Sequence, residues 1–94
     1  MELLDKAKIA LRITDEVFEP EILMLIEASK MDLEESGINV ESMLEDDIIQ
    51  TAIVFYVKSY FGYDNSDSEK QLRAYERLKT KLALASRWKT NEVK

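Results

Sequence analysis

Residues 48–65 read IIQTAIVFYVKSYFGYDN, the most apolar and aromatic stretch of a chain in which 34% of the residues are charged. A helix that spans a membrane needs about 20 predominantly apolar residues. The longest unbroken apolar run here extends only from Ala52 to Val57, because Lys58 follows it. On a helical wheel, apolar side chains cover most of the circumference, and a helix of this kind lies inside a protein core. The stretch therefore predicts a central buried helix over residues 45–61.

Three further helices are predicted around the central one. Apolar residues recur at helical spacing over residues 2–11, 18–36 and 67–88. Gly37 and Gly62 follow the second and third helices, and each fits the left-handed position that closes a helix. Two glycines and one proline argue against short strands joined by tight turns. The predicted fold class is all-α: a compact bundle of about four helices with a central apolar third helix.

The length of 94 residues predicts one domain. We expect it to cover residues 1–94, with about residues 89–94 as a flexible C-terminal tail. Around the second helix, several apolar residues lie beside the main apolar stripe. The residues expected to turn inward or to widen the buried face there are Val17, Phe18, Leu23, Met24 and Met31.

The composition lacks two residue types on which many active sites depend. The chain has no histidine and no cysteine, so imidazole bases, thiol nucleophiles, disulfides and thiolate metal sites are excluded. Two acidic segments, LEDD at residues 44–47 and DNSDSE at residues 64–69, lack the ligand spacing and turn glycine of a calcium loop. They are interpreted as charge at a helix start and as a turn with a capping box of Ser66 and Glu69. We therefore predict no enzyme activity, with no catalytic residue, no cofactor and no metal site.

Charge divides the chain into an acidic and a basic part. Residues 1–65 carry five Lys or Arg against fifteen Asp or Glu, whereas residues 66–94 carry eight Lys or Arg against four Asp or Glu. The acidic part would repel a nucleic-acid backbone, and the basic part alone would attract one. The start MELLDKAKIAL is acidic where a signal peptide is positively charged, so we expect an intracellular protein.

Three roles are open to the basic face of the fourth helix. The first role is a solvated face, the second is a contact for DNA phosphates, and the third is a contact for the acidic surface of another copy. The last is a head-to-tail interface, which closes into a ring if the rotation allows. The aromatic residues of the opening stretch favour core packing over base stacking, because only Lys58 supplies a nearby cation. The residues predicted at a self-assembly or partner interface are Tyr63, Arg73, Arg77, Lys81 and Trp88.

Three passages together resemble a known protein family. They are LRITDEVFEPEILMLIEASKMDLEESGI at residues 11–38, the opening stretch at residues 48–65, and YERLKTKLALAS at residues 75–86. Their order and spacing resemble the small head-tail connector proteins of tailed bacteriophages and prophages, which also serve as head-completion or DNA-packaging adaptors. The resemblance covers most of the chain and involves no chemical motif.

The resemblance implies a structural adaptor rather than an enzyme. Members of that family form a ring below the portal at the capsid vertex, extend the DNA channel and dock later completion or tail proteins. The implied partners are further copies of the chain, the portal protein and head-completion or tail proteins. DNA is implied only as passing cargo, and no membrane partner is expected. The implied location is the head-tail junction of the virion, and the host cytoplasm during assembly.

A second class of function stays open from the residues alone. A small intracellular helical binding or regulatory module, acting through its basic fourth helix, would bind DNA or an acidic partner in a salt-dependent way. An enzyme would have to rely on carboxylates, Lys and Tyr. No nucleophile beside a base can be identified from the spacing of those residues.

Overall fold

The structure is a computed structural model that describes residues 2–62 and 67–92, with side chains as far as residue 85. Its elements in chain order are α1 (Leu3–Leu11), α2 (Glu19–Glu35), the 3-10 turn η1 (Glu41–Met43), α3 (Asp47–Tyr60) and α4 (Ser68–Glu92). Within the described residues all regular structure is helical. The prediction of an all-α fold with four helices is confirmed.

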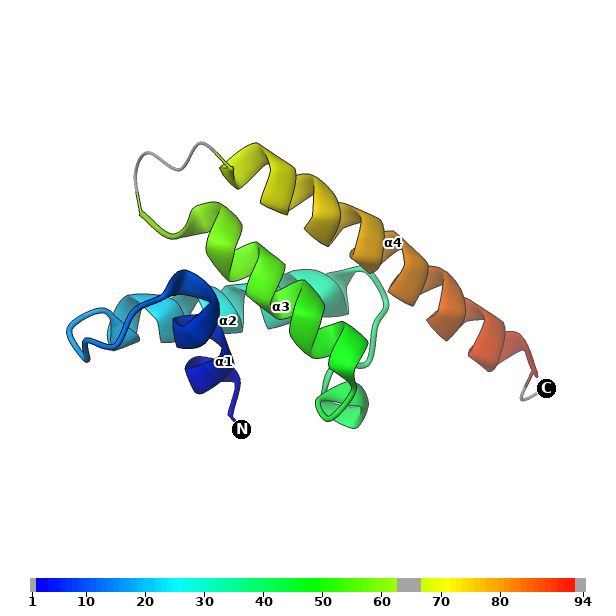
Figure 1. Cartoon of the computed structure of the whole chain (residues 1–94). Coiled ribbons are helices and arrows are strands. Elements are labelled where there is room, and N and C mark those ends of the chain that lie inside the picture. Colours follow the sequence, from blue (N-terminus) through cyan, green and yellow to red (C-terminus); the bar gives the residue numbers. More distant parts are fainter. Residues whose placement is uncertain (1, 63–66, 93–94) are drawn as a thin grey trace.

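Helix α3 is the centre of the fold, as its sequence predicts. It contacts each of the other three helices, and α1 and α4 lie on opposite sides of it (Figure 1). Four of its side chains are buried: Ile49, Ala52, Ile53 and Val57. Side chains from the neighbouring helices and from the segment after α2 complete the core, and these are Ala7, Ile22, Ile26, Leu33, Ile38, Val40, Tyr75 and Leu82.

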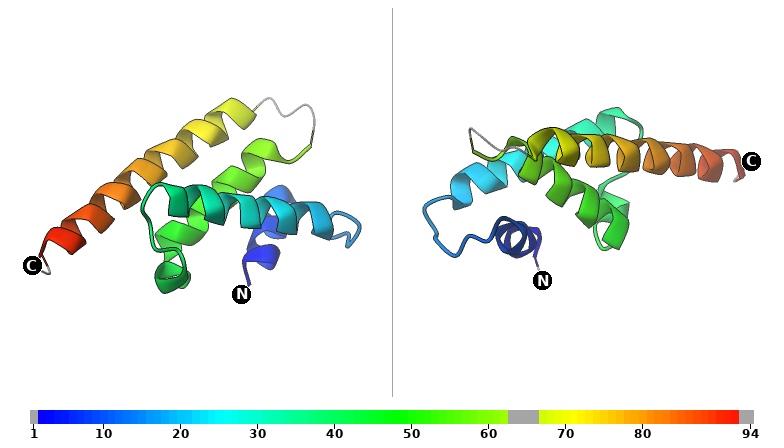
Figure 2. Two further views of the ribbon diagram at one scale, coloured as in Figure 1. Left: turned by 180° about the vertical axis from the view of Figure 1, so that it is seen from behind. Right: turned by 45° about the horizontal axis from the view of Figure 1, so that its top comes forward.

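Helix α4 is the longest element and makes the molecule elongated. It has 25 residues, whereas α3 has 14, and the overall dimensions are 48 × 26 × 18 Å. Its C-terminal half extends beyond the other helices in all views (Figures 1 and 2). Leu82 is buried, whereas Leu84 is half exposed. The helix was expected to end at residue 88 but continues to Glu92. The flexibility of the tail from about residue 89 stays a prediction.

The ends of α1 and α2 use the same closing motif with different residues. After α2, Gly37 has a φ of 91°, and the N–H groups of Gly37 and Ile38 donate to the carbonyls of Glu34 and Leu33. This is the left-handed closure predicted from the glycine. After α1, Arg12 takes that position with a φ of 60°. An L-residue adopts this conformation at an energetic cost, so the first closure could not be predicted from a glycine.

Several apolar residues do not lie where hydropathy placed them. The exposed fraction is 71% for Val17 and 41% for Phe18, although the Phe18 ring packs edge-to-face against Phe61. The expected widening of the buried face of α2 is also wrong, because Leu23, Met24 and Met31 are all exposed. The buried stripe of α2 is narrower than the set of apolar residues on that helix. Apolar side chains are thereby left on the outside.

Candidate assembly surfaces

Asp32 on α2 receives two hydrogen bonds from α4. The Tyr75 hydroxyl donates to Asp32 Oδ2 over 2.6 Å, and the Lys79 ammonium donates to the same oxygen over 3.0 Å. Tyr75 is fully buried, and its ring meets Tyr56 of α3 edge-to-face with centroids 5.1 Å apart. Lys79 Nζ also lies 5.4 Å from the centre of the Tyr75 ring, a distance suited to cation–π attraction. This polar contact fixes α4 against α2 and α3.

The ionisable groups of this contact stabilise one another. Burial works against the charge of Asp32, but the hydrogen bonds from Tyr75 and Lys79 outweigh it and lower the pKa of the carboxyl. Burial likewise opposes the charge of Lys79, yet the hydrogen bonds to Asp32 and Glu76 raise the pKa of the ammonium. Burial and the bond to Asp32 both raise the pKa of the Tyr75 phenol. At neutral pH the cluster is therefore held as carboxylate, ammonium and neutral phenol.

Polar contacts also attach α1 to the rest of the fold. Lys8 forms an ion pair of 2.6 Å with Glu19 at the start of α2, and the hydrogen bond to that carboxylate raises the pKa of Lys8. Lys6 donates a hydrogen bond to the side chain of Gln50 on α3. Gln50 in turn donates to the carbonyl of Leu44 over 2.7 Å. The amide of Gln50 thus joins α1, α3 and the segment after η1.

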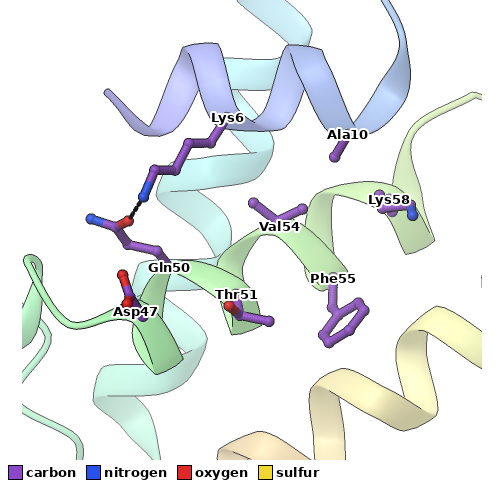
Figure 3. Close-up of a pocket in the computed structure, with 8 residues that line it drawn as sticks. All are labelled: Lys6, Ala10, Asp47, Gln50, Thr51, Val54, Phe55 and Lys58. Atoms are coloured by element: carbon purple, nitrogen blue, oxygen red, sulfur yellow. Dashed lines mark hydrogen bonds between the residues drawn. The ribbon is translucent and has the colours of Figure 1, made fainter. Parts of the chain in front are cut away.

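A shallow groove of about 240 Å³ lies between α1 and α3. Figure 3 shows Val54 pointing toward α1 from the floor of this groove, with Lys6 hydrogen-bonded to Gln50. The remaining lining residues are Ala10, Asp47, Thr51, Phe55 and Lys58. Polar and apolar side chains of both helices thus line the groove together.

The described part of the chain shows no grouping suited to a metal ion. Across residues 2–62 and 67–92, no three His, Cys, Asp or Glu side chains converge in a way that could hold one. No helix among these residues is long and apolar enough to cross a membrane.

Helix α4 presents a continuous basic surface on the side opposite Tyr75 and Leu82. Three of the predicted interface residues, Arg73, Arg77 and Lys81, are exposed there together. None of the three forms an ion pair within the described structure, whereas Lys79 on the inner side forms two. We call this surface the basic face of α4, defined by Lys70, Arg73, Arg77, Lys81 and Leu84.

The two other predicted interface residues cannot be placed in this way. Tyr63 lies outside the described residues, between α3 and α4. Trp88 lies within α4, in the part whose side chains the structure does not describe. Both stay predictions.

Helix α2 carries an acidic surface with methionines on the side opposite its buried residues. Met24 and Met31 are seven residues apart, on the same side of the helix, with exposed fractions of 67% and 63%. Glutamates surround them, and the last turn of the helix contains no basic residue. We call this surface the acidic face of α2, defined by Met24, Glu27, Met31, Glu34 and Glu35. Sequence reasoning missed it because it assigned both methionines to the core.

The structure is thus a small all-α module with two charged helix faces of opposite sign. The family model for phage connector proteins matches residues 3–89, which is nearly the whole sequence. The chain therefore belongs to the phage connector protein family. Searches of curated proteins and of solved structures gave no match. Membership assigns the chain to a structural, non-enzymatic family of phage components and confirms the resemblance stated from the sequence.

Proposed function

We propose that the chain is a subunit of a head-tail connector ring at the portal vertex of a tailed phage or prophage. In this role it extends the DNA channel and docks head-completion or tail proteins, with DNA as passing cargo only. The ring assembles in the host cytoplasm and stays at the head-tail junction of the virion. The observation that carries the proposal is the family match over residues 3–89.

Two physical features support an assembling subunit over an isolated monomer. A domain of 94 residues buries a modest share of its surface, so contacts with other subunits add to its stability. The two charged faces of opposite sign give each copy one surface for the copy before it and another for the copy after it. Such a heterologous contact generates a ring when its rotation closes.

Imaging combined with sedimentation tests this proposal directly. Analytical ultracentrifugation over a range of concentrations should detect a large species of defined size, and electron microscopy should show that it is annular. If the isolated chain stays monomeric, the same measurements are made after mixing it with a portal oligomer of the same phage or prophage. A strict monomer under both conditions contradicts the ring.

A DNA-binding or regulatory module is a second candidate, favoured by the exposure of Arg73 and Arg77. Phosphate contacts of this kind would give binding that weakens steeply with salt. A gel-shift assay at low ionic strength distinguishes the two functions. The connector proposal expects no stable shift with duplex DNA, whereas a shift that Arg73→Glu with Arg77→Glu abolishes would support the module.

A further inference from the structure

We propose that the acidic face of α2 in one copy docks against the basic face of α4 in the next copy, as an antiparallel helix pair. The inference rests on the proposed function, because it assumes that copies of the chain assemble. It adds what the family match does not contain: which two surfaces meet, in which direction and in which register.

The two faces cannot meet within one chain. Helices α2 and α4 touch each other through their inner sides, where Asp32 accepts hydrogen bonds from Tyr75 and Lys79. The basic face lies on the side of α4 opposite Tyr75 and therefore points away from α2, and the acidic face lies about a quarter turn around α2 from Asp32. A side chain on one outer face therefore reaches the other outer face only in a second copy.

The spacing of the side chains matches when the helices run in opposite directions. On α2 the series Met24, Glu27, Met31, Glu35 advances by three, four and four residues. On α4 the series Leu84, Lys81, Arg77, Arg73 goes back by the same three, four and four residues. Each series spans about 16 Å of helix. The facing pairs are Met24 with Leu84, Glu27 with Lys81, Met31 with Arg77, and Glu35 with Arg73.

Each facing pair is chemically suitable. Met24 and Leu84 are both exposed apolar side chains, and contact would remove them from water. Glu27 and Lys81 carry opposite charges, as do Glu35 and Arg73. The remaining pair places the aliphatic stem of Arg77 against Met31, which suits a long side chain that keeps its charged head in water.

A parallel arrangement fits less well. It also pairs acids with bases, because Glu27 then faces Arg73 and Glu35 faces Lys81. However, Met24 then faces Lys70, and Leu84 lies beyond the end of α2, opposite the buried Ile38. Neither Met24 nor Leu84 then gains an apolar partner. The antiparallel pair also aligns the helix dipoles favourably.

The acidic face has an electrostatic reason to take up a partner. Glu34 and Glu35 lie in the last turn of α2, which contains no basic residue. Negative charge at this position is unfavourable because the C-terminal end of a helix is itself the negative end of its dipole. Glu27 pairs with Lys30, but its side chain remains 69% exposed and accessible to a further cation. Cations from the basic face of a neighbouring copy would relieve this unfavourable charge.

Charge exchange tests both the contact and its register. Four variants are compared with the wild-type chain by sedimentation velocity: Glu27→Lys, Lys81→Glu, the matched double variant that combines them, and a mismatched double variant with Glu27→Lys and Arg73→Glu. All substituted residues are exposed, so helical content by circular dichroism should not change. If the isolated chain does not assemble, ring formation on the portal oligomer is scored for the same variants.

Each single reversal should raise the concentration needed for assembly about tenfold or more, because it places like charges opposite each other. The matched double variant should restore assembly, and the mismatched one should not. Equal loss in both double variants overturns the contact, and rescue by the mismatched one overturns the antiparallel register. If all four variants form rings as well as the wild-type chain does, this interface is ruled out but the proposed function is not. A wild-type chain that forms no ring, alone or on the portal, contradicts the proposed function instead.

Discussion

Helices α2 and α4 each carry an inner and an outer face. Opposite charges are paired on the inner faces and remain exposed on the outer faces. On the inner faces, Asp32 meets Tyr75 and Lys79 within one chain, next to a fully buried aromatic ring. On the outer faces, acidic residues of α2 and basic residues of α4 are exposed, and no ion pair joins the two sets within the described residues. The inner contact belongs to the fold of the monomer. The outer faces add little to that fold and are available to other molecules.

The largest predicted difference in stability is on α4, where substitution of the buried Tyr75 is compared with substitution of the exposed Arg73. Tyr75→Ala removes a buried ring and one hydrogen bond to Asp32, so it should lower the free energy of unfolding by about 3–5 kcal/mol. Arg73→Ala, on the outer side of the same helix, should change it by about 0.5 kcal/mol or less. Urea denaturation followed by circular dichroism measures both. Similar losses in the two variants would mean that the faces are not distinct.

The same contrast holds on α2, with a smaller expected effect. Leu33 is fully buried and Met31, two residues earlier, is 63% exposed. Leu33→Ala should lower the free energy of unfolding by about 2–5 kcal/mol. Met31→Ala should leave it within about 0.5 kcal/mol, because the side chain contributes little to the core of the monomer. Thermal unfolding of the two variants at low concentration, below any assembly, provides the measurement.

The smallest effect concerns the pH dependence of the inner contact. The lowered pKa of Asp32 contributes stability that is present above its ordinary pKa of 3.8 and is lost as pH falls through the folded value. The raised pKa values of Tyr75 and Lys79 contribute stability that is full below about pH 10 and is lost as pH rises above it. The stability advantage over Asp32→Asn should therefore shrink in acid. Denaturant unfolding between about pH 5 and pH 3 measures it, and a constant difference would contradict the assignment.

The sequence predicted the helices well because their signals are local. The apolar circumference of α3, the spacing of apolar residues and the glycine after α2 each act within a few residues. The Tyr75–Asp32 hydrogen bond could not be predicted in this way, because it joins residues 43 positions apart. The left-handed Arg12 was also missed, since only the geometry of the chain around α1 requires it.

The candidate surfaces were predicted only in part. Charge placed Arg73, Arg77 and Lys81 at an interface; the structure shows the three side chains exposed, and their role as an interface stays a prediction. Hydropathy placed Met24 and Met31 in the core, and this was wrong, because an apolar side chain on α2 fits a core or an interface equally well. Only the position of the neighbouring helices decides between the two. The acidic face of α2 therefore emerged from the structure alone.

Cysteine cross-linking tests most directly whether the outer faces join one copy to the next. The chain contains no cysteine, so a variant with Met24→Cys and Leu84→Cys has only these two thiols. They lie on the outer faces of two different helices and can form a disulfide only where two copies meet, within a Cα separation of about 4.4–6.8 Å. Oxidation of assembled protein should give a ladder of oligomers, whereas Ile9→Cys with Leu84→Cys should not. The absence of a ladder in the first variant, or equal ladders in both, would contradict the contact between the acidic face of α2 and the basic face of α4.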